Sequence, residues 1–220
     1  MPARTPARRI GFPGVDPEVD MQHDRYRPQT ALRCRAVLGA DGRIEVLNLQ
    51  TAVGSIDRSL GRDLPDDGIE PQAVEGLANQ PYDVANLLVE CVLKSTHIPV
   101  MFWRSVGSSQ NAFVVESFID ELAASAGEDP YRYRRRLLHK RPDFQRVLDA
   151  AAQKAGWDAK LPQGRGRGIA IHQSFGTIVA QVADVTVGRR VTSMWTASWR
   201  PPIAAMSSIP ASSRCRSRAP

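Results

Sequence analysis

The sequence predicts an α+β fold, in which strands and helices occupy separate stretches of the chain. Three observations support this prediction. Two strand-like runs at 32–38 and 43–49 flank an Asp-Gly turn, helical periodicity fills 111–156, and two further β-rich runs follow at 169–172 and 177–187. Strands followed by a helical block and then by more strands are typical of an α+β arrangement.

The first hairpin is predicted by the turn Gly39-Ala40-Asp41-Gly42, because an Asp-Gly step between two strand-like runs favours a tight reversal. Further strands are predicted at Asn86–Val92 and Thr96–Trp103, which are apolar and rich in β-forming residues. Residues 54–81, which precede these strands, are rich in Gly, Asp and Pro. We interpret them as a long surface loop.

A first helix is predicted to begin near Asn111, with Ser108 or Ser109 as its N-cap and Gly127 as its end. An amphipathic helix buries the residues that recur every three or four positions. The expected buried face therefore consists of Ala112, Val115, Phe118, Ile119, Leu122, Ala123 and Ala126.

The second helix is predicted to start at Asp129-Pro130, as N-cap and first helical residue, and to run to about Leu138. The arginines of 132–136 are interpreted as the solvated face of this short helix. A third helix follows Pro142 and is stopped by Gly156.

The chain divides into three parts by composition. Residues 1–20 hold four prolines and three arginines without periodicity and are expected to be irregular. Residues 21–187 carry the predicted elements. Residues 188–220 are crowded with Ser, Arg, Pro and Ala, and we expect a basic, disordered tail. One hypothesis is that this tail is translated in a shifted reading frame of a GC-rich gene; an ordinary basic tail is the alternative.

Charge and cysteine content exclude several classes. The net charge is +6, but 188–220 holds six arginines and no acid, which leaves 23 basic and 23 acidic residues in the rest. A nucleic-acid-binding domain would carry its basic patch on the folded part. Cys34, Cys91 and Cys215 fit neither a disulfide framework nor a zinc site. No secretory h-region or membrane-length apolar stretch is present, so a cytoplasmic location is the default.

No catalytic motif is complete by spacing alone: the chain has no Walker loop, GxSxG, HExxH or GxGxxG after a strand. The most specific segment is 102–123, where a glycine-bearing turn meets a helix N-terminus. Its backbone N–H groups, together with the guanidinium of Arg104, suit an anionic phosphate or a pterin-type ligand. In the alternative interpretation, Arg104 pairs with a carboxylate and the turn merely connects two elements.

Long motifs in this region resemble one family. The segment FWRSVGSSQNAFVVESFIDELAASAGEDPYRYRRRLL is similar to the second molybdopterin-binding region of the xanthine dehydrogenase/aldehyde oxidase superfamily, and most similar to the isoquinoline 1-oxidoreductase beta-subunit type. Three further blocks agree in order and spacing: MQHDRYRP at 21–28, VEGLANQPYDVANLLVE at 74–90 and AGWDAKLPQGRGRGIAIHQSFGTIVAQVADVTV at 155–187. The resemblance implies a partial molybdopterin-binding domain of a molybdenum hydroxylase over 21–187.

The resemblance also implies a chemistry. A molybdenum centre on a pterin, commonly in the cytosine dinucleotide form, would hydroxylate N-heteroaromatic rings or aldehydes with a water-derived oxygen. A small iron–sulfur subunit would take up the electrons. No residue of this chain is implied as a metal ligand. The implied cofactor-binding residues form two walls: Trp103, Arg104, Ser105, Val106, Gly107, Ser108 and Asn111 in the first, and His172, Gln173, Ser174, Phe175 and Gly176 in the second.

The chain departs from the family pattern in two motifs. A GGGFG-type loop does not precede the MQHD block, and no GxGE-type motif, whose glutamate serves as the general base, follows Val187. Glu116 and Glu121 lie at helical spacing and are not assigned as that base. We therefore expect an internal fragment without catalytic residues, inactive alone. A non-catalytic binding or assembly module, or a pseudogene product, is the alternative.

Overall fold

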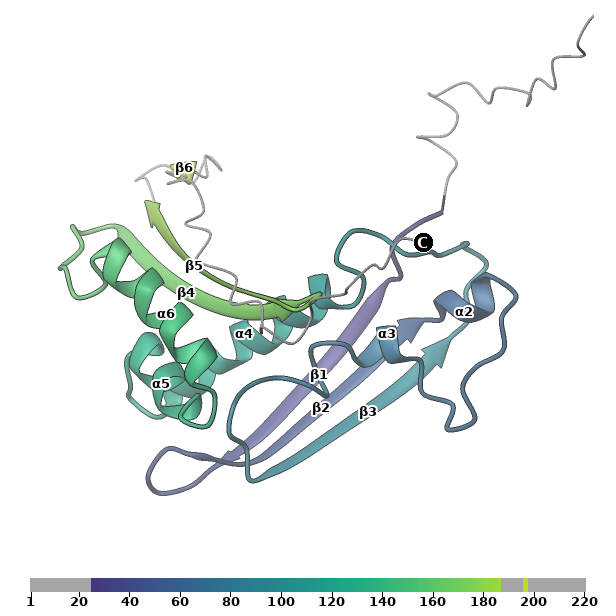
Figure 1. Ribbon diagram of the computed structural model, residues 1–220, viewed down its shortest axis with the longest axis horizontal. Helices are drawn as coiled ribbons and strands as arrows, with labels where there is room; N and C mark the ends of the chain where they lie inside the picture. Colours follow the sequence, from purple (N-terminus) through teal and green to yellow (C-terminus); the bar gives the residue numbers. More distant parts are fainter. Residues whose placement is uncertain (1–24, 187–195, 198–220) are drawn as a thin grey trace, which may run out of the picture.

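The computed structural model describes residues 25–186 and the backbone of Thr196–Ala197. In this part of the chain, two three-stranded sheets are arranged around a group of helices (Figure 1). This arrangement confirms the predicted α+β class. No helix among the described residues combines the length and apolarity needed to cross a bilayer.

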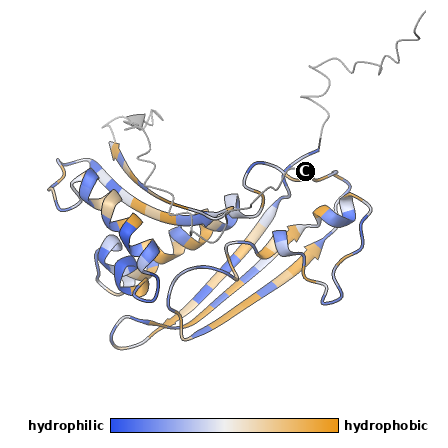
Figure 2. Ribbon diagram, in the orientation of Figure 1, coloured by the Kyte–Doolittle hydropathy of each residue, from blue (hydrophilic) through white to orange (hydrophobic). Residues whose placement is uncertain are grey.

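The first sheet begins with the predicted hairpin. Strand β1 (Thr30–Leu38) pairs antiparallel with β2 (Ile44–Gly54), and Gly42 takes a positive φ of 72° in the turn between them. Strand β3 (Asn86–Lys94) then pairs parallel with β2. Polar and apolar residues alternate along β1 and β2 (Figure 2), so one face of the sheet contributes to the core.

The prediction of a surface loop over 54–81 is wrong in part. This segment contains two one-turn helices, α2 (Ile56–Ser59) and α3 (Pro71–Val74), and it buries Ile56, Glu70 and Leu77. Gly, Asp and Pro do interrupt it, but the apolar side chains between them are drawn into the core. The segment is therefore a packed part of the fold.

The predicted strand at Thr96–Trp103 is also wrong. Only Val100 forms an isolated bridge, with Tyr26, and the Tyr26 N–H donates to the carbonyl of Pro99 at 3.0 Å. A strand needs a continuous ladder, and Pro99 has no N–H to donate to one. The segment therefore runs as an extended connection toward the next helix.

The central helix α4 (Ser108–Ser125) begins three positions before Asn111, where the sequence predicted its start. Gly107 is its N-cap, and no side chain caps the first turn. The prediction of Ser108 or Ser109 as N-cap is thus wrong: Ser108 is buried in the first turn, and the Ser109 hydroxyl donates to the carbonyl of Arg104. The predicted end at Gly127, with φ of 67°, agrees with the structure.

The two following helices confirm their predicted signals. Helix α5 (Pro130–Leu137) starts after Asp129, whose carboxylate accepts from the N–H groups of Tyr131 and Arg132. Helix α6 (Pro142–Ala155) ends at Gly156 in the left-handed conformation. These helices pack beside the second sheet, as Figure 1 shows.

The second sheet is built on the predicted C-terminal strands. Strand β4 (Arg165–Ser174) pairs antiparallel with β5 (Thr177–Thr186) through a two-residue turn at Phe175-Gly176. A short strand β6 (Thr196–Ala197) pairs with β5. It falls within 188–220, where we expected an irregular tail. The remaining residues of that range, and residues 1–20, lie outside the described part.

A buried ionic network joins α4 to α5. The guanidinium of Arg134, which is fully buried, donates from Nε to Glu116 at 3.0 Å and from Nη1 to Asp120 at 2.5 Å. The interpretation of 132–136 as a solvated face is therefore wrong for Arg134, although Arg132 and Arg135 are exposed. The carboxylate of Glu116, on the facing side of α4, makes this burial possible.

Candidate functional site

The turn at 103–107, which leads into α4, has an unusual backbone. The N–H of Val106 donates to the carbonyl of Trp103 at 2.9 Å, and Ser105 and Val106 have positive φ angles of 65° and 43°. Left-handed backbone is unfavourable for residues other than glycine, and especially for a β-branched valine. Such strain persists only where the surroundings impose it, which is common at functional sites.

Arg27 holds this turn in place. Its guanidinium donates from Nη1 to the carbonyl of Val106 at 3.0 Å and from Nη2 to the carbonyl of Arg104 at 2.8 Å. Both carbonyls are thereby fixed by one planar donor group. Arg27 was not singled out from the sequence, although it lies in the MQHDRYRP block that carries the resemblance.

Gly107 lets the helix N-terminus approach the preceding segment closely. The residue is buried, and a Cβ atom added to it would overlap with the carbonyl oxygen of Gln72 in α3. Because the obstacle is backbone, it cannot rotate away. Only glycine fits at this position while α3 and α4 keep their contact.

Asn111 also holds the N-terminus of α4 against α3 and the residues that follow it. It is fully buried, and its Nδ2 donates to the carbonyls of Ala73 at 3.2 Å and Glu75 at 2.8 Å. Its amide nitrogen is therefore used inside the protein, where it fixes the segment that follows α3 to the first turn of α4. Ser108 is likewise buried beside it on α4.

The two predicted walls meet at Gly76. A Cβ atom added to Gly76, which has a φ of 81°, would lie 2.9 Å from Cε1 of His172 and 3.7 Å from Cβ of Asn111. Strand β4 thus brings His172 to the N-terminal part of α4. Burial lowers the pKa of the His172 imidazole, and the nearby Glu75 carboxylate opposes this shift only in part.

Several buried polar atoms of the predicted walls have no hydrogen-bond partner among the described residues. They are Oγ of Ser108, Oδ1 of Asn111, Nε2 of His172 and Oγ of Ser174. Native proteins leave few such atoms unpaired, so a group of them indicates a place completed by a polar ligand or ordered water. The residues present therefore fit a group rich in hydrogen-bond donors and acceptors, such as a pterin.

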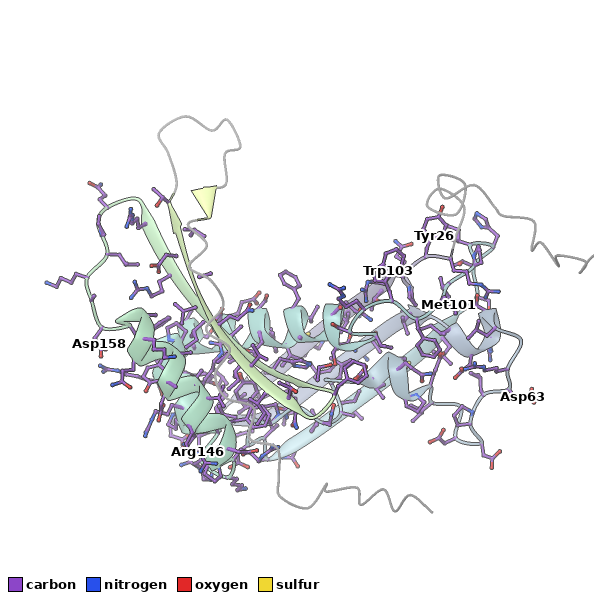
Figure 3. All side chains as sticks on the ribbon, turned by 45° about the horizontal axis from the view of Figure 1, so that its top comes forward. Tyr26, Asp63, Met101, Trp103, Arg146 and Asp158 are labelled. Atoms are coloured by element: carbon purple, nitrogen blue, oxygen red, sulfur yellow. The ribbon has the colours of Figure 1, made fainter. Side chains whose placement is uncertain are left out.

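The remaining predicted residues lie on the rim. Trp103 is 56% exposed and lies at the end of the molecule that also carries Tyr26 and Met101 (Figure 3). Arg104 is exposed, and among the described residues its guanidinium forms no hydrogen bond or ion pair. Phe175, at the tip of the β4–β5 hairpin, is 78% exposed and precedes Gly176, whereas Gln173 is half-buried. The contact between the walls thus runs through Gly76 and Asn111.

The described part of the chain has no group of three or more His, Cys, Asp or Glu side chains that could hold a metal ion.

Comparison with known protein families shows which family the chain belongs to. The sequence model of the molybdopterin cofactor-binding domain matches residues 15–138, from before β1 through α5. The chain belongs to this family. The resemblance found in the sequence is thereby confirmed, and the β4–β5 hairpin, which carries the predicted second wall, lies beyond the matched range.

Two curated relatives agree with this assignment. A nicotinate dehydrogenase subunit of Pseudomonas putida is 31% identical over 175 residues, which cover 70% of this chain and 15% of that protein. The beta subunit of isoquinoline 1-oxidoreductase of Brevundimonas diminuta is 27% identical over 184 residues, which cover 78% of this chain and 23% of that protein. The chain spans less than a quarter of the length of either relative.

Solved structures show the same fold. The aldehyde oxidoreductase of Desulfovibrio gigas matches with a TM-score of 0.51 at 19% identity, over 69% of this chain and 18% of that one. Quinoline 2-oxidoreductase of Pseudomonas putida 86 matches with a TM-score of 0.50 at 17% identity, over 67% of this chain and 21% of that one. At these identities the likeness concerns the fold alone.

Proposed function

We propose that this chain forms part of the molybdopterin-binding wall of a molybdenum hydroxylase large subunit, whose parent reaction hydroxylates N-heteroaromatic rings or aldehydes. The observation that carries the proposal is the braced turn at 103–107, held by Arg27 and followed directly by α4. The names of the relatives favour the heteroaromatic class, because nicotinate and isoquinoline are both N-heteroaromatic. When bound, the molybdenum–pterin group supplies the redox chemistry.

Arg104 is the residue best placed to bind the anionic part of the cofactor. Its guanidinium is exposed and forms no ion pair among the described residues, so its donor fork is open to a pyrophosphate. The first N–H groups of α4 follow directly and add the positive end of the helix dipole. A pyrophosphate belongs to the dinucleotide form of the cofactor, and we therefore propose a dinucleotide form; the choice of cytosine as its base rests on the family resemblance alone.

The other residues hold the site in shape. Gly107 and Asn111 keep the N-terminus of α4 against α3 and the residues that follow it, and Arg27 fixes two carbonyls of the turn. His172 and the residues up to Gly176 form the second wall. The lowered pKa of His172 keeps its ring neutral near pH 7, so that Nε2 can accept or donate a single hydrogen bond.

Turnover needs more than these residues. We propose that a small iron–sulfur subunit accepts the electrons in the parent enzyme. The sequence after Val187 contains no GxGE-type glutamate to serve as a base, and general-base assistance is typically worth about 10²–10⁴-fold in rate. The chain spans less than a quarter of the length of either curated relative, and we propose that it contributes to cofactor binding without measurable hydroxylation of its own.

Cofactor content tests this proposal. The full chain would be purified from cells that make the cofactor, and molybdenum and pterin would be measured per chain. We expect detectable pterin in the native chain and at least about tenfold less after Arg104→Ala, which removes the charged donor. Arg33→Ala, which removes an exposed arginine on β1, is the matched control and should leave the content unchanged. Equal pterin content in all three proteins, or none in any, would contradict the proposal.

A further inference from the structure

The carboxylate of Glu116 joins three segments of the protein. Its Oε1 accepts from the hydroxyl of Tyr82 at 2.7 Å. Its Oε2 accepts from Nε of Arg134 at 3.0 Å and from the backbone N–H of Ile171 at 2.9 Å. A single buried side chain on α4 therefore holds α5, β4 and the segment before β3 together.

Each of these contacts lies close in sequence to a residue of the candidate site. Ile171 directly precedes His172 on β4, and Tyr82 follows the segment that contains Gly76. Asn111 lies on α4 itself, about one and a half turns before Glu116. Glu116 thus connects α4, β4 and the segment from Gly76 to Tyr82. These three segments meet where the two predicted walls are in contact.

The bond to Ile171 is made at a free edge of the second sheet. Among the described residues β4 is the outer strand, and β5 occupies its other side. The N–H of Ile171 therefore has no neighbouring strand to pair with, and the Glu116 oxygen takes the place of that strand. This contact fixes how far β4 lies from α4.

Glu116 is not available to react with a substrate. Only 7% of its surface is exposed, and both oxygens already accept hydrogen bonds from the protein. Burial raises the pKa of its carboxyl, while the charge of Arg134 opposes that rise. These features suit a group that holds other residues in position.

We propose that Glu116 is a positioning residue, which sets β4 against α4 so that His172 packs on Gly76, which lies beside Asn111. Its relevance to cofactor binding rests on the proposed function, whereas the positioning itself concerns only this chain. Without the Glu116 acceptor, the edge of β4 would move from α4 and the His172 ring would become more hydrated.

The test is an NMR titration of His172 in the full, cofactor-free chain, with the signal assigned by His172→Gln. In Glu116→Leu, which removes both oxygens, the pKa of His172 should rise toward its ordinary value near 6.5, because hydration favours the charged form. Glu116→Gln keeps an acceptor and should restore part of the shift. Asp120→Asn is the matched control: Asp120 also binds Arg134, but no hydrogen bond joins its side chain to β4 among the described residues.

Amide hydrogen exchange at Ile171 gives a second readout. It should be about tenfold or more faster in Glu116→Gln, because a neutral acceptor binds the N–H less strongly than a carboxylate. This readout decides the question alone if Glu116→Leu does not fold. Unchanged Ile171 exchange and His172 pKa in the Glu116 variants, or equal changes in Asp120→Asn, would overturn the proposal. Because no cofactor is present, this outcome is independent of the cofactor-content experiment.

Discussion

Two carboxylates are buried in the described part of the chain, and they have very different surroundings. Glu116, in the helical region, is paired with Arg134 and accepts from Tyr82 and Ile171. Glu70, in the segment before β3, accepts from the N–H groups of Ile56 and Asp57 through Oε1, while its Oε2 has no partner among the described residues.

The same contrast extends to the regions around them. In the helical region the buried charges are satisfied by the protein itself, which is typical of a network that holds elements together. In the region from α3 to the first turn of α4, buried oxygen atoms of Glu70, Gln72, Ser108, Gln110 and Asn111 lack partners within the described chain. Unsatisfied polar groups concentrate where a protein binds something. The difference therefore separates a region whose buried polar groups are satisfied by the protein from the region that contains the candidate site.

The largest expected effect is in the helical region. Glu116→Ala would leave Nε of Arg134, the hydroxyl of Tyr82 and the N–H of Ile171 without their acceptor, while Nη1 of Arg134 would keep Asp120. Breaking a buried ion pair on one side typically costs about 3–5 kcal/mol of stability. Urea unfolding followed by circular dichroism would measure it.

The control for this prediction is an exposed pair in the same helical region. Arg135→Ala removes an ion pair with Asp149, and the Arg135 side chain is 52% exposed. Such pairs contribute about 0–1 kcal/mol, because water screens them. A loss for Glu116→Ala no larger than that for Arg135→Ala would remove the contrast between buried and exposed pairs on which the comparison depends.

A smaller effect is expected at the turn formed by residues 103–107. In Gly107→Ala the new methyl group would overlap with the backbone carbonyl of Gln72, so α3 and α4 must move apart. Overpacking of this kind costs about 1–3 kcal/mol. Differential scanning calorimetry would measure the loss. In Gly168→Ala, on β4, the methyl group would meet no atom within 4 Å, so we expect stability that is unchanged or up to about 1 kcal/mol higher. Equal losses in both variants would mean that the close approach at Gly107 is not what requires glycine.

Local signals predicted the regular elements well. The Asp41-Gly42 turn, the Asp129-Pro130 start of α5 and the stop at Gly156 each depend on the conformational preference of one or two residues. Such preferences act without regard to the rest of the chain. The same reasoning explains why the first hairpin, α5 and α6 could be predicted with close bounds, whereas α4, which has no side-chain cap, begins three residues before its predicted start.

Burial and pairing could not be predicted in the same way. The extended run at Thr96–Trp103 has strand composition but, within the described chain, finds no partner strand beyond the bridge at Val100. Arg134 has the residue type of a surface position, and only the tertiary position of Glu116 makes its burial favourable. Both outcomes depend on segments distant in sequence.

The candidate site shows the same division. The glycine-bearing motif in 102–123 predicted which stretch leads into α4. The family resemblance predicted that residues 172–176 lie near that stretch and form a second wall of the site. The left-handed turn at Ser105 and Val106, the clamp by Arg27 and the meeting of His172 with Gly76 are properties of the folded chain. The sequence contains no period or spacing that would encode them.

The smallest expected effect concerns Glu70. Glu70→Gln keeps one oxygen to accept from the N–H groups of Ile56 and Asp57, although an uncharged acceptor binds them less strongly than a carboxylate. This loss is offset, because burying an amide without a counter-charge is less unfavourable than burying a carboxylate. We therefore expect the free energy of unfolding to change by less than about 1 kcal/mol, within the range of ordinary single hydrogen bonds.

Glu70→Ala, which removes the acceptor as well, should cost about 0.5–2 kcal/mol, as the loss of a helix cap does. Chemical denaturation of both variants beside Glu116→Ala would rank the two buried carboxylates directly. A loss above about 2 kcal/mol for Glu70→Gln would mean that a cationic group balances the charge of Glu70. Both buried carboxylates would then be satisfied by the protein, and the two regions would differ only in which groups satisfy them.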